Sequence, residues 1–242
     1  MLVFAGFSGT LYQVNTTRIG LHFFRNLAHF SFQNLWFLAV AYIPLSQLFA
    51  LESSTPIWVA LLAPFFLQEA LKTRQIISVV FGFVGVLIIV RPDVSHFNPA
   101  VLAAMTCALC FAGSMMANKK LTQDQLITCI LFWLTLMQFG MGLVTSAYNG
   151  ELVILSGINN LWVLTVGLGG LMAHFCITKA LALAPAVVVV PLDFMRLPLI
   201  SVVGFLVYDE MFEWDVIIGA LFIFFATLIN LKAEQKQSQL KS

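Results

Sequence analysis

The chain has 242 residues, of which 60% are hydrophobic and only 10% are charged, and its mean hydropathy is +0.96. Soluble domains carry about 25% charged residues, so this composition excludes a well-solvated globular surface and indicates a protein embedded in lipid. The formal net charge of +1 gives no basis for binding nucleic acid.

Apolar segments of membrane-spanning length recur along the chain, and each ends at a short polar or proline-containing break. We predict eight full transmembrane helices, at residues 20–42, 45–67, 75–91, 99–117, 126–147, 159–183, 186–208 and 214–231. Because the breaks are short, neighbouring helices must run antiparallel. The N-terminal stub Met1–Phe7 is apolar but too short to span a bilayer, and residues 232–242 form a polar tail.

Basic side chains gather on one side of this predicted topology. Eight spans place the following residues on that side: Arg18, Arg25, Lys72, Arg74, Lys119, Lys120, Lys232, Lys236 and Lys241. The opposite side holds Arg91 and these acidic residues: Glu151, Asp209, Glu210, Glu213 and Asp215. Because Lys and Arg are enriched in cytoplasmic loops, we predict a multi-pass inner-membrane protein whose basic loops and C-terminus are cytoplasmic.

The four cysteines lie inside apolar stretches. Cys107 and Cys110 form a C-x-x-C pair, but this pair falls within a predicted helix and no second pair accompanies it. We therefore interpret the cysteines as small packing residues, and we predict neither a metal site nor a cofactor.

An internal repeat appears when the chain is compared with itself at an offset of 141 residues. The segment that ends at Pro44 then lies over the segment that ends at Pro185, and Glu52 lies over Asp193. An odd number of predicted spans separates the two copies, so they must cross the membrane in opposite directions. Inverted repeats of this kind are typical of secondary transporters, whose binding site lies between the repeats.

The two copies differ in completeness. The second, at residues 99–231, contains five predicted helices, whereas the first, at residues 1–91, contains three. The offset predicts a further helix that ends near residue 6, where the apolar stub lies. We therefore expect an all-α membrane protein with eight of the ten helices of a 5+5 inverted repeat, its first repeat lacking the first helix and most of the second. The alternative is a native eight-span protein whose stub lies along the membrane surface.

The clearest candidate site is a charged pair inside the seventh predicted helix. Asp193 and Arg196 are three residues apart and therefore share a helix face. Pro191 and Pro198 flank them, and each proline frees a backbone carbonyl that needs a partner or a wet cavity. Ionisable groups at bilayer depth are costly and usually face partners or a cavity. We predict a substrate-binding pair, with a structural ion pair between helices as the alternative.

Glu52 is a second candidate, because it is the repeat mate of Asp193. Pro56 lies four residues later and frees the carbonyl of Glu52. We predict that Glu52 acts in substrate binding, as a gate, or as a proton site coupled to transport. The alternative is a carboxylate near the interface that is hydrogen-bonded to the hydroxyls of residues 53–55. Glu69 and Glu210, which end their helices, are interpreted as structural residues that bond backbone amides of the other repeat.

Gln33 and His174 are also repeat mates, and we predict that both contact substrate. Gln33 lies on one helix face with Asn26 and His29, and a polar stripe of this kind suggests an aqueous path. The alternative is hydrogen bonding between helices. For His174 the alternative is that the side chain only packs between helices. Several glycines, at positions 82, 85, 167, 169 and 170, are expected to permit close helix contact.

Two sets of residues carry a family resemblance. The second half contains Ala184-Pro185, then Pro191-Leu-Asp-Phe-Met-Arg-Leu-Pro198, then Tyr208-Asp-Glu210. The first half contains, in the corresponding order, Pro44, Pro56, Gln68-Glu69 and Gly82-Phe-Val-Gly85. In this pattern the chain resembles EamA-type members of the drug/metabolite transporter superfamily over nearly its whole length. The order of His22-Phe-Phe-Arg25-Asn, Phe97-Asn-Pro99 and Asn118-Lys-Lys120 is most similar to the S-adenosylmethionine uptake-type subgroup, although riboflavin and amino-acid exporters share much of the scaffold.

The resemblance implies a secondary transporter that moves a small organic metabolite or drug by alternating access. Coupling to protons or to exchange of a counter-metabolite is compatible with it, and so is a dimer. An enzyme is not expected, and the sequence has no H-E-x-x-H metalloprotease motif. The rival interpretation is an inactive fragment or structural membrane partner, which the missing N-terminal helices motivate.

Overall fold

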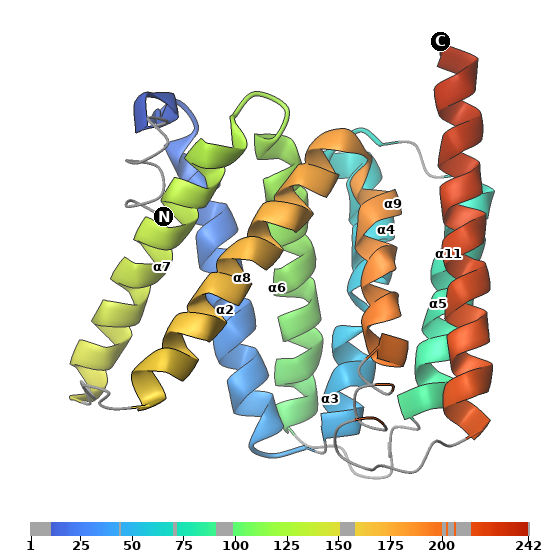
Figure 1. Ribbon diagram of the computed structural model, residues 1–242, viewed down its shortest axis with the longest axis horizontal. Helices are drawn as coiled ribbons and strands as arrows, with labels where there is room; N and C mark the ends of the chain where they lie inside the picture. Colours follow the sequence, from blue (N-terminus) through green and yellow to red (C-terminus); the bar gives the residue numbers. More distant parts are fainter. Residues whose placement is uncertain are drawn as a thin grey trace. The chain divides into compact units, whose positions relative to one another are not determined.

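The computed structural model describes residues 11–43, 45–69, 72–90, 99–150, 158–199, 202, 206 and 214–241. All regular elements in this part of the chain are helical, as predicted (Figure 1). They are η1 (Leu11–Gln13), α2 (Ile19–Val40), α3 (Leu45–Glu52), α4 (Thr55–Phe66), α5 (Thr73–Val90), α6 (Pro99–Leu121), α7 (Ile127–Asn149), α8 (Ile158–Leu183), α9 (Ala186–Val189), η2 (Val190–Met195) and α11 (Trp214–Lys241).

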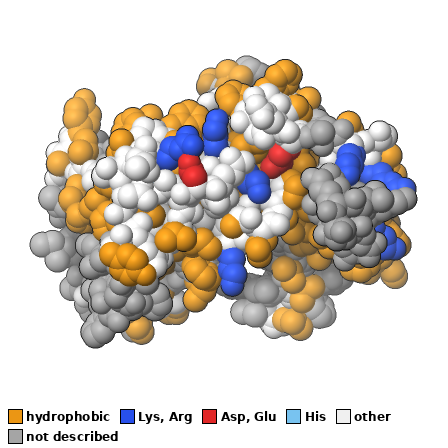
Figure 2. Space-filling view, turned by 90° about the horizontal axis from the view of Figure 1, so that it is seen from above, with side chains coloured by type: hydrophobic (Ala, Val, Ile, Leu, Met, Phe, Trp, Pro, Cys, Tyr) orange, Lys and Arg blue, Asp and Glu red, His pale blue; other side chains and the backbone are white. Residues whose placement is uncertain are grey.

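Five helical stretches in the described residues are long and apolar enough to cross a membrane. They are Leu48–Phe66, Pro99–Leu121, Ile127–Tyr148, Asn160–Leu183 and Trp214–Lys232. Each coincides with one of the eight predicted spans. α5 is apolar but shorter, at Thr73–Ile89. Large hydrophobic side chains are exposed over much of the surface, among few charged ones (Figure 2). The chain is therefore a multi-pass helical membrane protein.

Three predicted features are not tested by these spans. α2 is a helix of 22 residues, as predicted, but it is not among the five stretches that are long and apolar enough to cross a membrane. The segment predicted at 186–208 is described continuously only to residue 199. The stub Met1–Phe7 and the acidic residues Glu151, Asp209, Glu210 and Glu213 lie outside the described residues.

The chain folds as two compact units. Unit 1 comprises Met1–Phe30 and Ala117–Ala184, and unit 2 comprises Ser31–Met116 and Pro185–Ser242. The boundaries fall within α2, within α6 and just after α8. The units therefore do not coincide with the two predicted repeats, since each unit draws on both halves of the sequence.

In unit 2, α5 and α11 lie side by side and run antiparallel (Figure 1). Toward one end of the pair, the Ser78 hydroxyl donates a hydrogen bond to the carbonyl of Ala226 at 2.7 Å. A turn or two further along α5, Gly85 meets Gly219, which precedes Ala226 in α11. Because neither glycine has a side chain, the two backbones approach closely enough to pack carbonyl against Cα.

One pair of repeat mates in unit 2 is in direct contact. Phe81 of α5 and Phe222 of α11 are 141 residues apart, and their rings stack with centroids 5.9 Å apart and planes 21° apart. The offset that relates the two halves of the sequence thus also relates two residues that are in contact in the structure.

The close crossing of α5 and α11 predicts a stability difference between two glycine substitutions. A Cβ added at Gly85 would lie 2.7 Å from the carbonyl oxygen of Gly219, so the helices must move apart. We expect Gly85→Ala to lower the free energy of unfolding by about 1–3 kcal/mol. Gly140→Ala in α7 is the control, because a Cβ there meets nothing within 4 Å. Unfolding of both variants in detergent tests this, and equal stability would contradict the described packing.

The expectation for the other glycines is met in part. Gly82 packs directly under the ring of Phe194, so it permits close contact as predicted. At Gly167, Gly169 and Gly170 a Cβ would meet nothing within 4 Å, so the prediction of close contact at these positions is wrong. Their neighbours on α8 have exposed side chains, and this stretch of the helix packs against little within the described residues.

Candidate functional site

The site begins at a break between two helices of unit 2. α3 ends at Glu52 and α4 begins at Thr55, with Pro56 in its first turn. Pro56 has no amide hydrogen, so it cannot bond to the carbonyl of Glu52. The Thr55 hydroxyl bonds to that carbonyl instead, at 2.7 Å. The freed carbonyl that the sequence predicts is thus satisfied locally, and the chain stays broken at residues 53 and 54.

A second irregular segment of unit 2 carries the other charged residues. α9 is followed by the 3-10 segment η2, which contains Pro191 and Asp193, and residues 196–199 are again α-helical and contain Pro198. Proline fits the tight η2 segment because its missing amide removes an ordinary α-helical bond. Asn230 of α11 donates to the carbonyl of Val188 at 3.1 Å and ties this segment to its neighbour.

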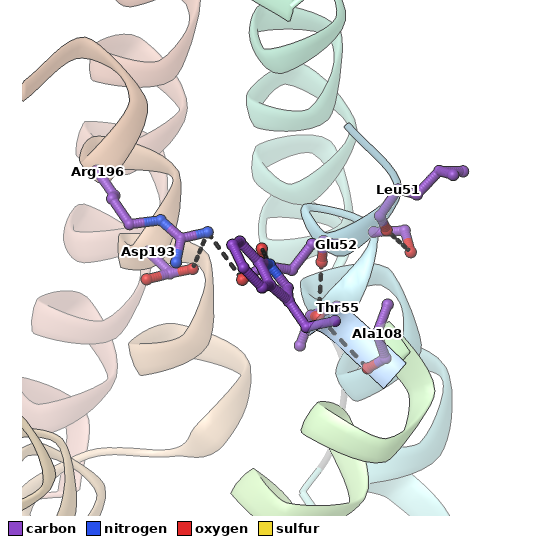
Figure 3. Close-up of polar contacts among 8 residues, drawn as sticks. Leu51, Glu52, Thr55, Ala108, Asp193 and Arg196 are labelled. Carbon is purple, nitrogen blue, oxygen red and sulfur yellow. Dashed lines mark hydrogen bonds and ion pairs between the residues drawn. The ribbon is translucent and has the colours of Figure 1, made fainter. Parts of the chain in front are cut away.

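The two irregular segments meet through Arg196. Its Nη2 atom lies 2.9 Å from Oε1 of Glu52 and 3.6 Å from Oδ2 of Asp193 (Figure 3). We call these three residues the ion-pair cluster. Asp193 and Arg196 lie close together, as their shared helix face predicts, and Glu52, predicted from the repeat alone, joins them; their role in substrate binding stays a prediction. The Glu52 side chain is 3% exposed, that of Arg196 35%, and that of Asp193 46%.

Two aromatic residues complete the surroundings of Glu52 and Arg196. The Trp36 indole donates its N–H to Oε2 of Glu52 at 3.0 Å, while Arg196 binds the other oxygen. The Arg196 guanidinium lies 5.5 Å from the centre of the Phe49 ring, within range of a cation–π interaction. Both oxygens of the Glu52 carboxylate thus have partners, while the hydroxyls of Ser54 and Thr55 donate to backbone carbonyls instead.

Trp36 is the residue that sequence reasoning missed. The one signal is its indole N–H, which a buried tryptophan usually donates to a partner. That partner depends on how α2 packs against α3. With 23 phenylalanines and five tryptophans in the chain, no single aromatic residue stands out in the sequence.

The other two predicted substrate residues lie in different units. Gln33 lies in unit 2 on α2, one turn before Trp36, and its side chain is exposed. His174 lies in unit 1 on α8, with Nδ1 3.4 Å from Nη2 of Arg25 and its ring 4.8 Å from that of His29. The structure thus gathers three of the five predicted residues into one cluster and gives His174 a separate set of partners.

Glu69 holds the start of the segment that carries Asp193 and Arg196. Its carboxylate accepts hydrogen bonds from the backbone amides of Ala186 at 3.1 Å and Val187 at 3.4 Å. Gln68, just before it, has a positive φ of 56°, which turns the chain out of α4. The prediction that Glu69 bonds amides of the other repeat is confirmed, while Glu210 lies outside the described residues.

The cluster combines two carboxylates with one guanidinium, so its formal charge is −1. Such a group can attract a cation at the more exposed carboxylate, that of Asp193. In the part of the chain that the structure describes, no three His, Cys, Asp or Glu side chains are placed to hold a metal ion.

Comparison with known proteins shows what the chain is similar to. Residues 1–91 match the EamA-like transporter family. The chain is 25% identical to an S-adenosylmethionine uptake transporter of Rickettsia bellii, over 92% of this chain and 76% of that protein. It is 28% identical to a riboflavin transporter of Vibrio cholerae, over 96% of this chain and 78% of that protein.

A solved structure has the same fold. It superposes with a TM-score of 0.80 at 15% sequence identity, over 100% of this chain and 84% of the other. The chain spans the membrane several times, and its first 91 residues resemble the EamA-like transporter family.

Proposed function

We propose that this chain is a secondary transporter that carries a small, positively charged organic metabolite across the inner membrane by alternating access. The observation that carries the proposal is the ion-pair cluster at two broken helices of a membrane protein. Ionisable groups within membrane helices are costly and mark substrate or ion pathways. Transporters commonly bind substrate where their helices are discontinuous. Pro56, Pro191 and Pro198 give the site its irregular backbone.

The charge of the cluster favours one substrate class over another. Relatives at similar identity are named as transporters of S-adenosylmethionine and of riboflavin. S-adenosylmethionine carries a sulfonium and an ammonium group, whereas riboflavin is uncharged at neutral pH. A formal charge of −1 attracts the first and offers nothing specific to the second. We therefore assign an S-adenosylmethionine-like cation as the substrate.

The three charged residues have different roles in this proposal. Glu52 is buried, and both of its carboxylate oxygens have partners, so it orients Arg196. Asp193 is the most exposed member and receives the cationic group of the substrate. Arg196 holds the two carboxylates at a fixed spacing and keeps the empty site from carrying two uncompensated negative charges. Gln33 and His174 provide further polar contacts along the substrate path.

Alternating access follows from the inverted relation of the halves. We assign the repeats to residues 1–91 and 99–231, each complete enough to supply one broken helix to the site. The contact between Phe81 and Phe222, which are 141 residues apart, supports this division. Rocking of one bundle against another exposes such a site to either side in turn. Proton binding to a carboxylate, or exchange for a counter-metabolite, supplies the coupling. The enrichment of Lys and Arg on one side of the predicted topology supports an orientation with the basic loops and the C-terminus in the cytoplasm.

Uptake into membrane vesicles tests the proposed function. Vesicles from cells expressing the full chain, and vesicles lacking it, receive labelled S-adenosylmethionine, riboflavin or amino acids. We expect saturable uptake of S-adenosylmethionine that unlabelled riboflavin does not inhibit. The absence of saturable uptake of every probe would contradict a transporter. Uptake of riboflavin that S-adenosylmethionine does not inhibit would contradict the charge argument.

A further inference from the structure

Four residues of unit 2 form a closed ring of contacts that includes the Glu52 carboxylate. Arg196 reaches across to Oε1 of Glu52 at 2.9 Å (Figure 3), and the indole of Trp36 donates to Oε2 at 3.0 Å. The rings of Trp36 and Phe49 stand at 62° to each other with centroids 6.4 Å apart. The Arg196 guanidinium, 5.5 Å from the centre of the Phe49 ring, closes the ring of contacts. All four residues belong to one compact unit.

The two aromatic side chains of this ring of contacts are held in place from behind. Phe49 packs on one cluster of buried residues, which comprises Val86, Phe194, Leu197 and Ile223. Trp36 packs on a second cluster, which comprises Ala39, Ile43, Leu48, Ala100 and Ala104. Phe49 and Trp36 are themselves only partly buried. Each aromatic ring therefore has a fixed position and keeps part of its surface open, and a group fixed in advance loses little conformational freedom when a ligand binds.

The open surface of Phe49 adjoins a charged region. The Arg196 side chain is 35% exposed, and that of Asp193, 3.6 Å away, is 46% exposed. Charged side chains of a membrane protein face partners or a water-filled cavity rather than lipid. Because Phe49 lies against the guanidinium, its ring stands at the edge of that water-facing region, where a polar metabolite can reach it.

An indole, a phenyl ring and a guanidinium share one property, which is a flat face of delocalised electrons. Aromatic side chains stack on flat rings of a ligand, and the planar guanidinium of arginine stacks on aromatic faces as well. Stacking accepts any flat ring, because each has such a face, whereas an aliphatic group has none. The three side chains therefore suit a flat aromatic ring, such as a purine, better than an aliphatic chain.

Arg196 joins this aromatic surface to the proposed cation site. Its Nη2 atom contacts Glu52, within the ring of contacts, and Asp193, outside it. A single small molecule reaches both places when a short linker joins its ring to its cationic group. In S-adenosylmethionine one ribose joins the adenine to the carbon that carries the sulfonium, so this class of molecule meets the requirement.

We propose that Trp36, Phe49 and the guanidinium of Arg196 form a stacking site for a flat aromatic ring of the transported metabolite. This inference rests on the proposed function and deepens it: Asp193 receives the cationic group, and the stacking site selects cations that carry a purine or a similar ring over aliphatic cations. Phe49 is the residue of this set to test, since Trp36 and Arg196 also hold the Glu52 carboxylate.

Two probes with the same charged groups test the inference: S-adenosylmethionine and S-methylmethionine, which has a methyl group in place of the adenosyl group. Binding of each is measured by the thermal stabilisation of the purified full chain in lipid nanodiscs. We expect the wild type to bind S-adenosylmethionine more tightly by about 10-fold or more. Phe49→Leu and Phe49→Met fill the space without a ring, so each should reduce this preference to about twofold or less. Phe49→Tyr keeps a flat ring and should retain most of it.

A matched control separates the ring from a general effect of the substitution. Phe65→Leu changes an α4 side chain that is 81% exposed and lies outside the ring of contacts, so it should keep the preference of the wild type. Retained binding of S-methylmethionine by the Phe49 variants shows that they are folded. Their loss should therefore appear in the binding of S-adenosylmethionine alone.

The outcomes separate this inference from the proposed function. An equal loss of both probes in the Phe49 variants, or an unchanged preference, overturns the stacking site. If the wild type binds both probes alike and loses both in Asp193→Asn, the stacking site is overturned and the proposed cation site stands. If the preference depends on Phe49 while Asp193→Asn binds both probes as the wild type does, the stacking site stands and the cation site fails. If the wild type binds neither probe, both proposals are overturned for this substrate class.

Discussion

Arg196→Gln is expected to lower the free energy of unfolding by about 3–5 kcal/mol, the range for breaking a buried ion pair from one side. The substitution leaves the Glu52 carboxylate, 3% exposed, without its cation. Trp36 still donates one hydrogen bond, but an indole cannot neutralise a charge. Chemical unfolding in detergent measures the loss. We expect transport to be lost with it, since the spacing of the two carboxylates depends on Arg196.

A double substitution separates charge from packing in this prediction. Glu52→Gln combined with Arg196→Gln removes both charges, so the stability lost through the unpaired Glu52 carboxylate should return, while the loss of Arg196 packing is common to both variants. Transport should not return, because the orientation of Asp193 is not restored. If the single and double variants are equally unstable, the effect of Arg196 comes from its packing on Phe49, and the ion-pair cluster is not what stabilises this part of unit 2.

Asp193→Asn, unlike Arg196→Gln, should have little effect on stability, but it should have a large effect on transport. The Asp193 side chain is 46% exposed and its carboxylate lies 3.6 Å from Arg196, a long distance for an ion pair. Exposed pairs contribute about 0–1 kcal/mol, so the free energy of unfolding should change by no more than that. Uptake of a cationic substrate should fall about 30-fold or more, because the charge that receives it is gone.

A matched variant identifies the cause of that transport loss. Asp193→Glu keeps the charge on a side chain one methylene longer, so it should recover a measurable part of the uptake that Asp193→Asn loses. The comparison is made on vesicles with equal amounts of protein. If Asp193→Asn transports as well as the wild type, Asp193 does not receive the substrate. If Asp193→Glu is as inactive as Asp193→Asn, shape rather than charge decides, and the charge argument for the substrate fails.

The local features of this site could be predicted from the sequence because they follow chain spacing. Residues three apart share a helix face, which gave the pair of Asp193 and Arg196. Proline removes a fixed hydrogen bond, which gave the irregular backbone near Pro56 and Pro191. The 141-residue offset singled out Glu52, which the structure brings to Arg196.

The features that the sequence could not predict depend on tertiary packing. The bond from Trp36 to Glu52 arises because α2 passes beside the end of α3, which no local pattern encodes. Gln33 and His174 are repeat mates, yet they belong to different units, because the unit boundaries fall within α2 and α6 rather than between the repeats. Glycines permit close packing but do not cause it, so Gly85 lies at a tight crossing while Gly167 faces open space.

The proposed preference for a positively charged substrate is tested most directly by one competition experiment. Inhibition of labelled S-adenosylmethionine uptake is compared for unlabelled S-adenosylmethionine and S-adenosylhomocysteine, which has a neutral thioether in place of the sulfonium. We predict that the wild-type protein prefers the sulfonium compound by about 30-fold or more and that Asp193→Asn loses this preference. Equal inhibition by both compounds in the wild type, or a preference that survives in Asp193→Asn, would contradict it.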